Sequence, residues 1–514
     1  MALITNYWSL DGIIILTILF IIVYLYMTRN FKYWEKRGVF QIKPTPFVGN
    51  FMECLLLKKA PSYYLKELYD QAKSEAYLGF YIFDKPFLLL RDPEIIKSVM
   101  IKDFNTFFDR YASSDPNDRM GYANLFRIKN PAWKIVRTKL TPFFTSGRMK
   151  KMFGLMLECG KHLDEYLNSL KLDGKGLIID VKDISSKLTM DIISSTAFGL
   201  DVNAFKDPNT DFRKYGKMIL QTNYIRGWAI LGFFFLPNLV RLFKLTMFGK
   251  DTTMYLRKLF WETITRRMNS GERRYDLIDI LIELKKNNSD EEIEGFKFDG
   301  DDLMAQAASF FTAGFDSSAV PAAFALYELA LQPDIQSKLR EEIHEALNNS
   351  DGNVTYDMLI SSLPYMDMVI AEALRKYPPL GFLNRKAMQT YKIPNSNLVL
   401  EKGTPVYIPM LGLHYDPQYF PDPEKFDPER FSEENKRNIP SCVYFPFGGG
   451  PHACIGNRFG HLLIKLILTK LLNECEVTPC EKTLIPIKIE PLISTTTPLN
   501  GVMYLTLRKV NTVD

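Results

Sequence analysis

The stretch "FPFGGGPHACIG", from Phe445 to Gly456, places one cysteine, Cys454, in a glycine-rich turn directly before a long apolar run. Such a cysteine has several ordinary explanations: a buried thiol, half of a disulfide, a zinc ligand, or part of a glycine loop that cradles phosphate. It could also be the only protein ligand of a metal. The rest of the sequence has to distinguish these alternatives.

The chain is large and close to electrically neutral. It has 514 residues, of which 46% are apolar, and no internal repeat or low-complexity linker divides it, so we expect one large, mostly helical body. A net charge of +5, from 64 basic and 59 acidic residues, is too mild to indicate nucleic-acid binding. The cysteines are scattered and do not resemble a secreted disulfide framework. Cys475 and Cys480 lack the second ligand pair that a zinc site needs.

The amino terminus predicts a membrane anchor. Residues Gly12 to Met27 are uncharged and apolar, and with Trp8 to Leu10 the segment reaches about 20 residues, enough to span a bilayer. No small-residue cleavage site follows, which favours a retained anchor over a signal peptide. The positive-inside rule then places the body in the cytoplasm, where Cys454 would stay reduced. The basic residues behind that rule are Arg29, Lys32, Lys36 and Arg37.

A short proline-containing segment follows the anchor. The sequence "KPTPFVGN", residues 43–50, predicts a stiff hinge, although an ordinary loop would look the same. We therefore expect an anchor over residues 1–28, a linker over 29–50 and the main body over 51–514.

A second apolar segment lies between Ile225 and Lys244. It is too short to span a bilayer. It is either a buried core helix or a lip that dips into the membrane, and the sequence leaves both interpretations open.

The segment from Gly300 to Gln332 predicts a long buried helix with a flaw at its centre. Ala, Leu, Met and Phe dominate it. Pro321 has no N–H for the carbonyl of Ser317, so the helix is expected to open there. Asp316 and the opened turn could hold water and relay protons. The alternative is a kinked helix whose serines bond back to the preceding turn.

Two further pairs mean little alone. Glu372 and Arg375, in "EALR", place opposite charges three residues apart on an apolar helix, and Arg430 in "PERF" is a candidate third partner. Trp133 and Arg137, in "WKIVR", share one helix face that would suit an anionic group.

Together these motifs resemble the cytochrome P-450 family. The pattern Phe447-x-x-Gly450-x-His452-x-Cys454-x-Gly456 is similar to the family's haem-thiolate loop. The other motifs follow in the family's order: "WKIVR", "AGFDSS", "EALR" and "PERF". The chain looks most like insect microsomal enzymes of the drug-metabolising clan.

The resemblance implies a mainly α fold with small β-sheets, and haem b (iron protoporphyrin IX) as the cofactor. Cys454 would ligate the iron, with its pKa lowered by backbone N–H groups where the following helix begins. The glycines would let the backbone approach the porphyrin, and Phe447 would shield the sulfur. The family pattern assigns cofactor binding to Trp133, Arg137, Arg385, Phe447, Gly450, His452, Cys454 and Gly456, and a structural triad to Glu372, Arg375 and Arg430.

The catalytic pair implied by the family is Asp316 and Ser317. The family's usual residue at the second position is threonine, and serine keeps the hydroxyl but loses the methyl group that restricts its rotamer. Phe310, Phe311, Ala313 and Phe315 are candidates for the substrate wall, and the helix phase does not tell which of them face the pocket. Residues Phe104 to Phe126, with the Ile225–Lys244 lip, are expected to shape substrate access.

The resemblance implies a monooxygenase of the endoplasmic reticulum membrane that inserts one oxygen atom of O2 into lipophilic xenobiotics such as plant compounds or insecticides. Electrons would come from NADPH through a separate cytochrome P-450 reductase, with cytochrome b5 as a further candidate partner. The glycine loop also fits a dinucleotide fingerprint, but the strand–turn–helix context is missing. Candidates for a basic docking face are Lys134, Lys139, Lys436 and Arg437.

Three rival functions remain at this point. An endogenous hormone or fatty-acid hydroxylase would use the same site. A haem-thiolate isomerase or dehydratase would not need O2, and the acid–hydroxyl pair argues against it. A haem carrier would not need an apolar access route.

Overall fold

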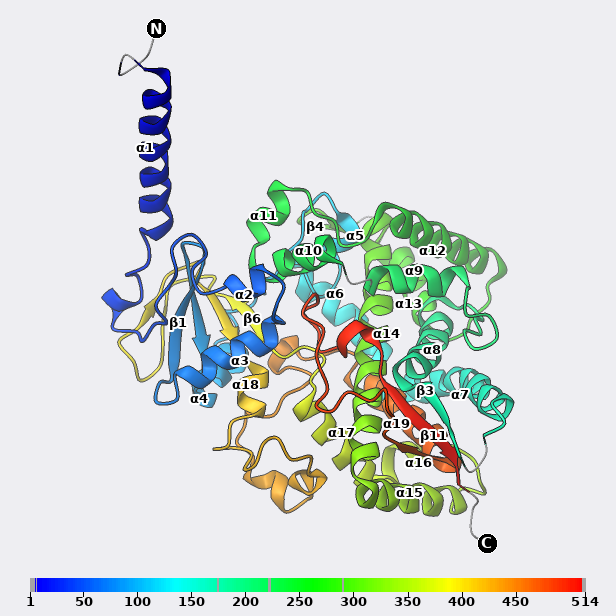
Figure 1. The fold of residues 1–514 in the computed structure, drawn as a ribbon. Helices are drawn as coiled ribbons and strands as arrows, with labels where there is room; N and C mark the ends of the chain where they lie inside the picture. The colour runs from blue at the N-terminus through cyan, green and yellow to red at the C-terminus, as the bar shows by residue number, and fades with distance from the viewer. Residues whose placement is uncertain (1–4, 6, 173–174, 221–222, 289–290, 511–514) are drawn as a thin grey trace.

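The computed structural model describes residues 5, 7–172, 175–220, 223–288 and 291–510. Helices form most of the molecule around the long helix α14 (Gly300–Leu331), and a smaller lobe built on a four-stranded sheet lies to one side (Figure 1). Buried apolar side chains form one large cluster in the helical part and a second in the sheet lobe. The predicted mainly α fold with small sheets is confirmed.

The other helices surround α14 or cover the sheet lobe. They are α1 (Trp8–Thr28), α2 (Met52–Leu55), α3 (Pro61–Gln71), α4 (Pro93–Lys97), α5 (Arg119–Tyr122), α6 (Ala132–Leu140), α7 (Ser146–Ser169), α8 (Val181–Ile193), α9 (Asp211–Leu220), α10 (Tyr224–Phe235), α11 (Pro237–Leu242), α12 (Lys250–Ser270), α13 (Leu277–Asn288), α15 (Pro333–Asn348), α16 (Tyr356–Ser361), α17 (Pro364–Lys376), α18 (Met410–His414) and α19 (Asn457–Glu474).

The main sheet has the strand order β1-β2-β9-β6, in which only β2 and β9 run parallel. Its register places Arg385 of β6 opposite Val406 of β9. The remaining strands form smaller sheets. The strands are β1 (Tyr77–Ile82), β2 (Lys85–Leu90), β3 (Leu177–Asp180), β4 (Glu292–Ile293), β5 (Phe296–Lys297), β6 (Leu383–Lys386), β7 (Tyr391–Lys392), β8 (Val399–Leu400), β9 (Pro405–Ile408), β10 (Cys475–Thr478) and β11 (Tyr504–Lys509).

Helix α14 runs without interruption through Pro321, so the expected opening at Ser317 is wrong. The Ser317 hydroxyl instead donates to the carbonyl of Ala313, which is the back-bonding alternative. The helix is packed by α8, α17 and α19, and nearly all of its carboxyl-terminal half is buried. Tertiary packing therefore keeps the helix continuous where the local sequence favours a break.

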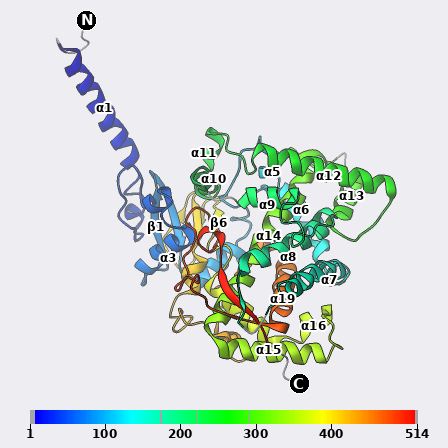
Figure 2. The same ribbon diagram turned by 45° about the vertical axis from the view of Figure 1, so that its right-hand side comes forward.

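Helix α1 projects away from the body and exposes its apolar side chains (Figures 1 and 2). It has 21 residues and a mean hydropathy of 2.4 over its most apolar window, which is long and apolar enough to cross a membrane. The predicted apolar anchor helix is therefore present.

The segment from residue 29 to residue 50 is not a free hinge. Trp34 is fully buried, and Gly49 pairs with Ile82 at the edge of the sheet. Gly49 has φ +68°, and a Cβ there would lie 2.4 Å from the carbonyl oxygen of Tyr81. The prolines and the glycine therefore serve a tight turn packed on the sheet, and the hinge interpretation is wrong.

Helices α10 and α11 form the predicted second apolar segment. Both interpretations hold in part: Leu231 and Phe235 of α10 are buried in the core of the sheet lobe, as expected of a core helix, whereas the outer side of α10 and α11 is exposed, as expected of a lip. Both views show α1 extending toward the side of the molecule on which α10 and α11 lie. The exposed residues are Tyr224, Ile225, Trp228, Leu242 and Phe243.

Candidate functional site

The cysteine loop is held by short backbone bonds. The Cys454 N–H donates to the Phe447 carbonyl at 2.7 Å, and the Gly448 N–H donates to the Phe445 carbonyl at 2.7 Å. Helix α19 begins at Asn457, so Cys454 lies just ahead of its first turn. The loop thus presents one sulfur at the amino end of a helix that packs against α14.

The positive φ of Gly450 serves contact with the protein itself. Gly450 has φ +66°, and a Cβ there would lie 2.2 Å from the carbonyl oxygen of Met100. The expected close neighbour of this glycine is a cofactor, but the observed one is the turn Ser98–Lys102. Phe447 packs on α19, with its ring centroid 4.8 Å from that of His461. Gly456, at the start of α19, has only ordinary contacts, with Phe144.

The Cys454 side chain is accessible although it lies deep within the protein. Burial raises the pKa of its thiol above the ordinary value. The Gly456 N–H and the charges of Arg137 and Arg110 lower that pKa by less. The expected net lowering by the helix start is therefore wrong for the metal-free thiol. Metal coordination would reverse the balance, because a coordinating thiol is deprotonated outright.

Three arginines gather beside this cysteine from separate elements. Arg137 comes from α6, Arg385 from β6, and Arg110 from the segment before α5. Burial, and then repulsion from Arg385 and Arg137, hold the pKa of Arg110 well below its usual range. Burial lowers the pKa of Arg385 to about 10. We name these three residues the arginine cluster.

Among the described residues, no carboxylate forms an ion pair with any member of the arginine cluster. Arg385 donates only to the carbonyl of Asn384, and its Nε has no partner within that part of the chain. Arg110 donates to the carbonyls of Phe126 and His452. Buried cations without a counter-ion are costly, so the cluster fits a ligand that carries negative charge.

His452 and Trp133 pack against each other next to the cluster. Their ring centroids are 3.9 Å apart, and His452 Nε2 lies 2.7 Å from the Phe108 carbonyl oxygen. His452 Nδ1 has no partner among the described residues. Burial, with Arg110 and Arg385, lowers the pKa of His452. The structure therefore brings together the sequence-predicted residues Trp133, Arg137, Arg385, His452 and Cys454.

Arg110 was missed by the sequence reasoning. It stands in "FDRY", which has no helical spacing to another candidate and no flanking pattern typical of a site. Its position depends on contacts with residues far along the chain, such as the carbonyl of His452. The only available signal was its place at the start of the segment that we expected to shape substrate access.

Asp316 and Ser317 point to different sides of α14. Asp316 is buried and pairs with Lys182 at the start of α8, with 3.0 Å between Oδ1 and Nζ. That contact meets an ion-pair distance but not hydrogen-bond geometry, so Oδ1 has no hydrogen-bond partner within the described chain. Ser317 is exposed, and its hydroxyl bonds to Ala313. The two predicted catalytic residues are adjacent but are not hydrogen-bonded to each other.

The phase of α14 separates the four expected wall residues. Phe310 and Ala313 lie on the accessible side with Ser317. Phe311 and Phe315 are buried, and Phe311 packs against Phe212 with 4.7 Å between ring centroids. Phe311 and Phe315 therefore face the core beside α8 and α9, and of the four candidates Phe310 and Ala313 stay candidates for the wall.

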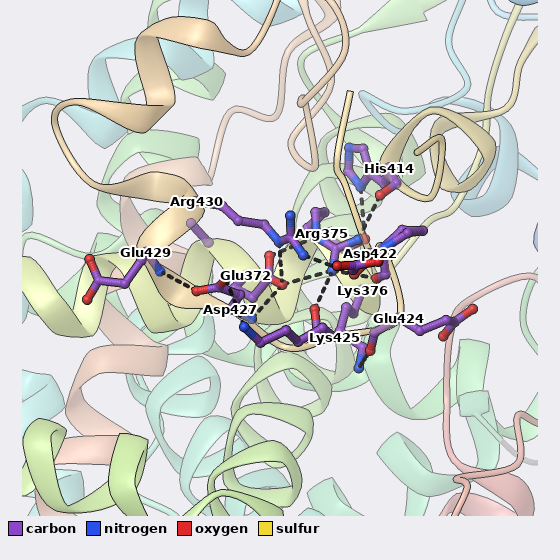
Figure 3. Close-up of polar contacts among 12 residues, drawn as sticks. Glu372, Arg375, Lys376, His414, Asp422, Glu424, Lys425, Asp427, Glu429 and Arg430 are labelled. Atoms are coloured by element: carbon purple, nitrogen blue, oxygen red, sulfur yellow. Dashed lines mark hydrogen bonds and ion pairs between the residues drawn. The ribbon is translucent and has the colours of Figure 1, made fainter. Parts of the chain in front are cut away.

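The predicted triad is present and closed (Figure 3). Glu372 Oε2 lies 2.7 Å from Arg375 Nε, and both side chains are fully buried. Arg430 Nε lies 3.5 Å from Glu372 Oε1, and the Asp427 N–H donates to the same oxygen at 2.9 Å. Arg375 also donates to the carbonyl of His414 at 2.8 Å. This network satisfies its charges within the chain.

Comparison with known proteins identifies the family. The model of the cytochrome P450 family matches residues 41–504. The chain belongs to the cytochrome P450 family. It is 44% identical over 517 residues to cytochrome P450 6k1 of Blattella germanica, covering 98% of each chain. It is 42% identical over 495 residues to probable cytochrome P450 6g2 of Drosophila melanogaster, covering 94% of this chain and 95% of the relative.

Membership of the family means that this P450 binds haem through a cysteine thiolate. The residues around Cys454 also fit a haem group, independently of the family assignment. An accessible sulfur deep in the fold lies near three cationic side chains that lack a counter-ion, and haem carries two anionic propionates. The unpartnered Nε of Arg385 is a suitable donor for those oxygens. His452 Nδ1 is not, because the ring is neutral and its N–H is on Nε2, which faces the Phe108 carbonyl.

Proposed function

We propose that this P450 is a membrane-anchored monooxygenase that inserts one oxygen atom of O2 into lipophilic substrates, with xenobiotics as the substrate class. Electrons would come from NADPH through a separate reductase. The apolar α1 and the exposed apolar side of α10 and α11 support a route for substrates that dissolve in the bilayer.

The observation that carries this proposal is the accessible Cys454 sulfur beside the arginine cluster. We assign Cys454 as the iron ligand. We assign Arg110, Arg137 and Arg385 to the propionates, with Trp133 and His452 as neighbours that fix the geometry. Each charge-assisted hydrogen bond to a propionate would contribute about 1.5–3 kcal/mol.

Haem bound at Cys454 supplies the activation of O2, which thiolate ligation favours. The ion pair with Lys182 holds the Asp316 carboxylate on the α8 side of α14. Proton delivery toward Ser317 therefore requires the Asp316 side chain to turn away from Lys182. Ser317 Oγ donates to Ala313 and keeps its lone pairs free to accept a proton on the accessible side. This acid and hydroxyl favour oxygen chemistry over an isomerase or dehydratase.

We place this P450 in the endoplasmic reticulum membrane with its body in the cytoplasm, because basic residues follow α1. Two of the four expected docking residues have partners. Lys436 pairs with Glu433, and Lys139 bonds to Asn288. Lys134 and Arg437 remain candidates for contact with an acidic reductase surface.

The decisive experiment replaces the proposed iron ligand, Cys454. In the purified, reduced, haem-loaded protein, Cys454→Ala should abolish the carbon-monoxide absorption band of thiolate ligation and stop NADPH-dependent turnover with a reductase. Cys442→Ala is the matched control, because Cys442 lies in the preceding turn and its sulfur accepts a hydrogen bond from the Ser441 hydroxyl. If Cys454→Ala keeps the same band as Cys442→Ala, the assignment of the ligand is wrong.

A further inference from the structure

One carboxylate joins the two segments that border the proposed access route. Asp118 precedes α5, and its Oδ2 accepts the N–H of Met247 at 2.6 Å. Its Oδ1 accepts the N–H of Gly121 at 3.2 Å, which caps α5. Met247 follows α11, so this single side chain bonds both its own short helix and the segment that carries the apolar lip.

The α5 side of this contact is firmly attached to α14. Arg119 Nε donates to Asp302 at 2.7 Å. Gln306 Nε2 donates to the Ala123 carbonyl at 2.8 Å, and its Oε1 accepts the Leu125 N–H at 3.1 Å. These bonds come from the amino-terminal part of the central helix, so α5 forms part of the rigid scaffold.

The lip side has a small core, and α10 is also anchored in the core of the sheet lobe through Leu231 and Phe235. Ala229, Phe233 and Val240 are buried together, and Leu245 and Met247 pack against them. Its outer apolar side chains are exposed. The helices α10 and α11 lie near α5 in both views (Figures 1 and 2). Because Leu231 and Phe235 fix α10, it is the α11 end of the lip and the segment leading to Met247 that can shift when its outer bonds break.

At Gly121, α5 and the segment that carries the lip come into close contact. A Cβ on Gly121 would lie 2.2 Å from Asp118 Oδ2 and 2.7 Å from Met247 Cβ. A side chain at residue 121 would therefore push apart the two residues that form the bond. The glycine and the carboxylate together allow the lip segment to sit directly on α5.

We propose that Asp118 is a positioning residue that latches the α11 end of the lip onto α5, through Met247, and so limits the admission of bulky lipophilic substrates. This inference rests on the proposed function, because a haem pocket must lie behind the lip. The latch acts through the position of Met247 and takes no part in the chemistry. A second bond, from the Ser113 N–H to the Phe233 carbonyl at 3.0 Å, keeps the lip attached when the latch opens.

The test compares Asp118→Asn with Asp115→Asn in the full-length, haem-loaded protein. The amide introduced by Asp118→Asn has one acceptor oxygen in place of two. Asp115 is buried in the same segment, and among the described residues its side chain accepts hydrogen bonds from Asn117 alone. Imidazole is the small probe and clotrimazole the bulky one, since both ligate haem iron and change its absorption. Asp118→Asn should raise the association and dissociation rates of clotrimazole about tenfold or more and leave those of imidazole unchanged.

A measurement that does not depend on haem tests the latch independently of the proposed function. Amide hydrogen exchange at residues 243–249 should become about tenfold or more faster in Asp118→Asn and stay unchanged in Asp115→Asn. Equal exchange in the two variants, or equal acceleration of both azoles, would overturn the latch. Failure of either azole to perturb the spectrum of any variant would instead overturn the haem assignment.

A second variant, Gly121→Ala, tests the same contact if Asp118→Asn fails to fold. Gly121→Ala should reproduce the faster clotrimazole exchange by separating Asp118 from Met247. The double variant should be no faster than either single variant, because both break the same contact. Independent, additive effects would show that the two residues do not act through one bond, and the latch would be refuted.

Discussion

Two groups of buried arginines in this P450 have opposite surroundings. Arg375 is fully buried, yet Glu372 pairs with it, and carbonyls including that of His414 accept its remaining N–H groups. Arg385 is almost as deeply buried, but within the described chain it donates only to the Asn384 carbonyl and keeps an unpartnered Nε. The positive charge of a buried arginine is therefore neutralised by a carboxylate in the triad, whereas in the arginine cluster it has no carboxylate partner among the described residues.

This difference separates structural charge from binding charge. A buried ion pair is already neutralised, so it does not attract a charged ligand. Removing one partner leaves the other charge buried without a counter-ion, which is strongly destabilising. A cluster of like charges repels itself until an anion arrives, and this repulsion adds to burial, the larger cause, in lowering the pKa of Arg110. Burial alone does not distinguish the two groups, whereas the presence of a counter-ion does.

The largest expected effect is on the triad. Glu372→Ala would leave Arg375 and Arg430 without their shared carboxylate. We expect the free energy of unfolding to fall by about 3–5 kcal/mol, measured on the haem-free protein by denaturant titration. Glu429→Ala is the control, because Glu429 lies beside Arg430 but forms an exposed pair with Lys338 that is worth about 1 kcal/mol or less. Similar losses in the two variants would contradict the structural role of the triad.

The arginine cluster should behave in the opposite way. Arg385→Ala removes one of three like charges, so the haem-free protein should be no less stable, while haem should dissociate about 10- to 100-fold faster. Transfer of haem to an excess of apomyoglobin measures that rate. Arg127→Ala is the control, because Arg127 is also buried with its pKa lowered to about 10 by burial, but it contacts Phe233 and the Gly121 carbonyl. If haem dissociated faster from Arg127→Ala than from Arg385→Ala, the assignment of Arg385 to the haem propionates would be wrong.

The sequence predicted the elements that depend on local pattern. The apolar run of α1, the long α14 and the spacing of Glu372 and Arg375 all have a periodicity that can be read directly. The order of the motifs also led to the family. The triad's third member, Arg430, could be placed only because its motif is typical of that family.

The features that were missed depend on contacts between distant segments. Arg110 reaches the carbonyl of His452, and Gly450 faces the carbonyl of Met100, and neither partner is implied by local spacing. The phase of α14 was ambiguous because apolar residues surround the helix, so Phe311 could not be told apart from Phe310. The packed turn at Gly49 looked like a hinge because prolines and glycines mark both.

The smallest effect on stability concerns Ser317, which belongs to neither group of charges. Its hydroxyl makes one hydrogen bond to Ala313 on an accessible side, so Ser317→Ala should change the free energy of unfolding by about 0.5 kcal/mol or less. The fraction of NADPH electrons recovered in product should nevertheless fall, because no hydroxyl remains at that position of α14 to accept and pass a proton. Ser318→Ala is the matched control, since Ser318 is buried near Gly460 on α19. Equal electron recovery in the two variants would mean that the proton passes without this hydroxyl, and the catalytic assignment would then fall to Asp316 alone.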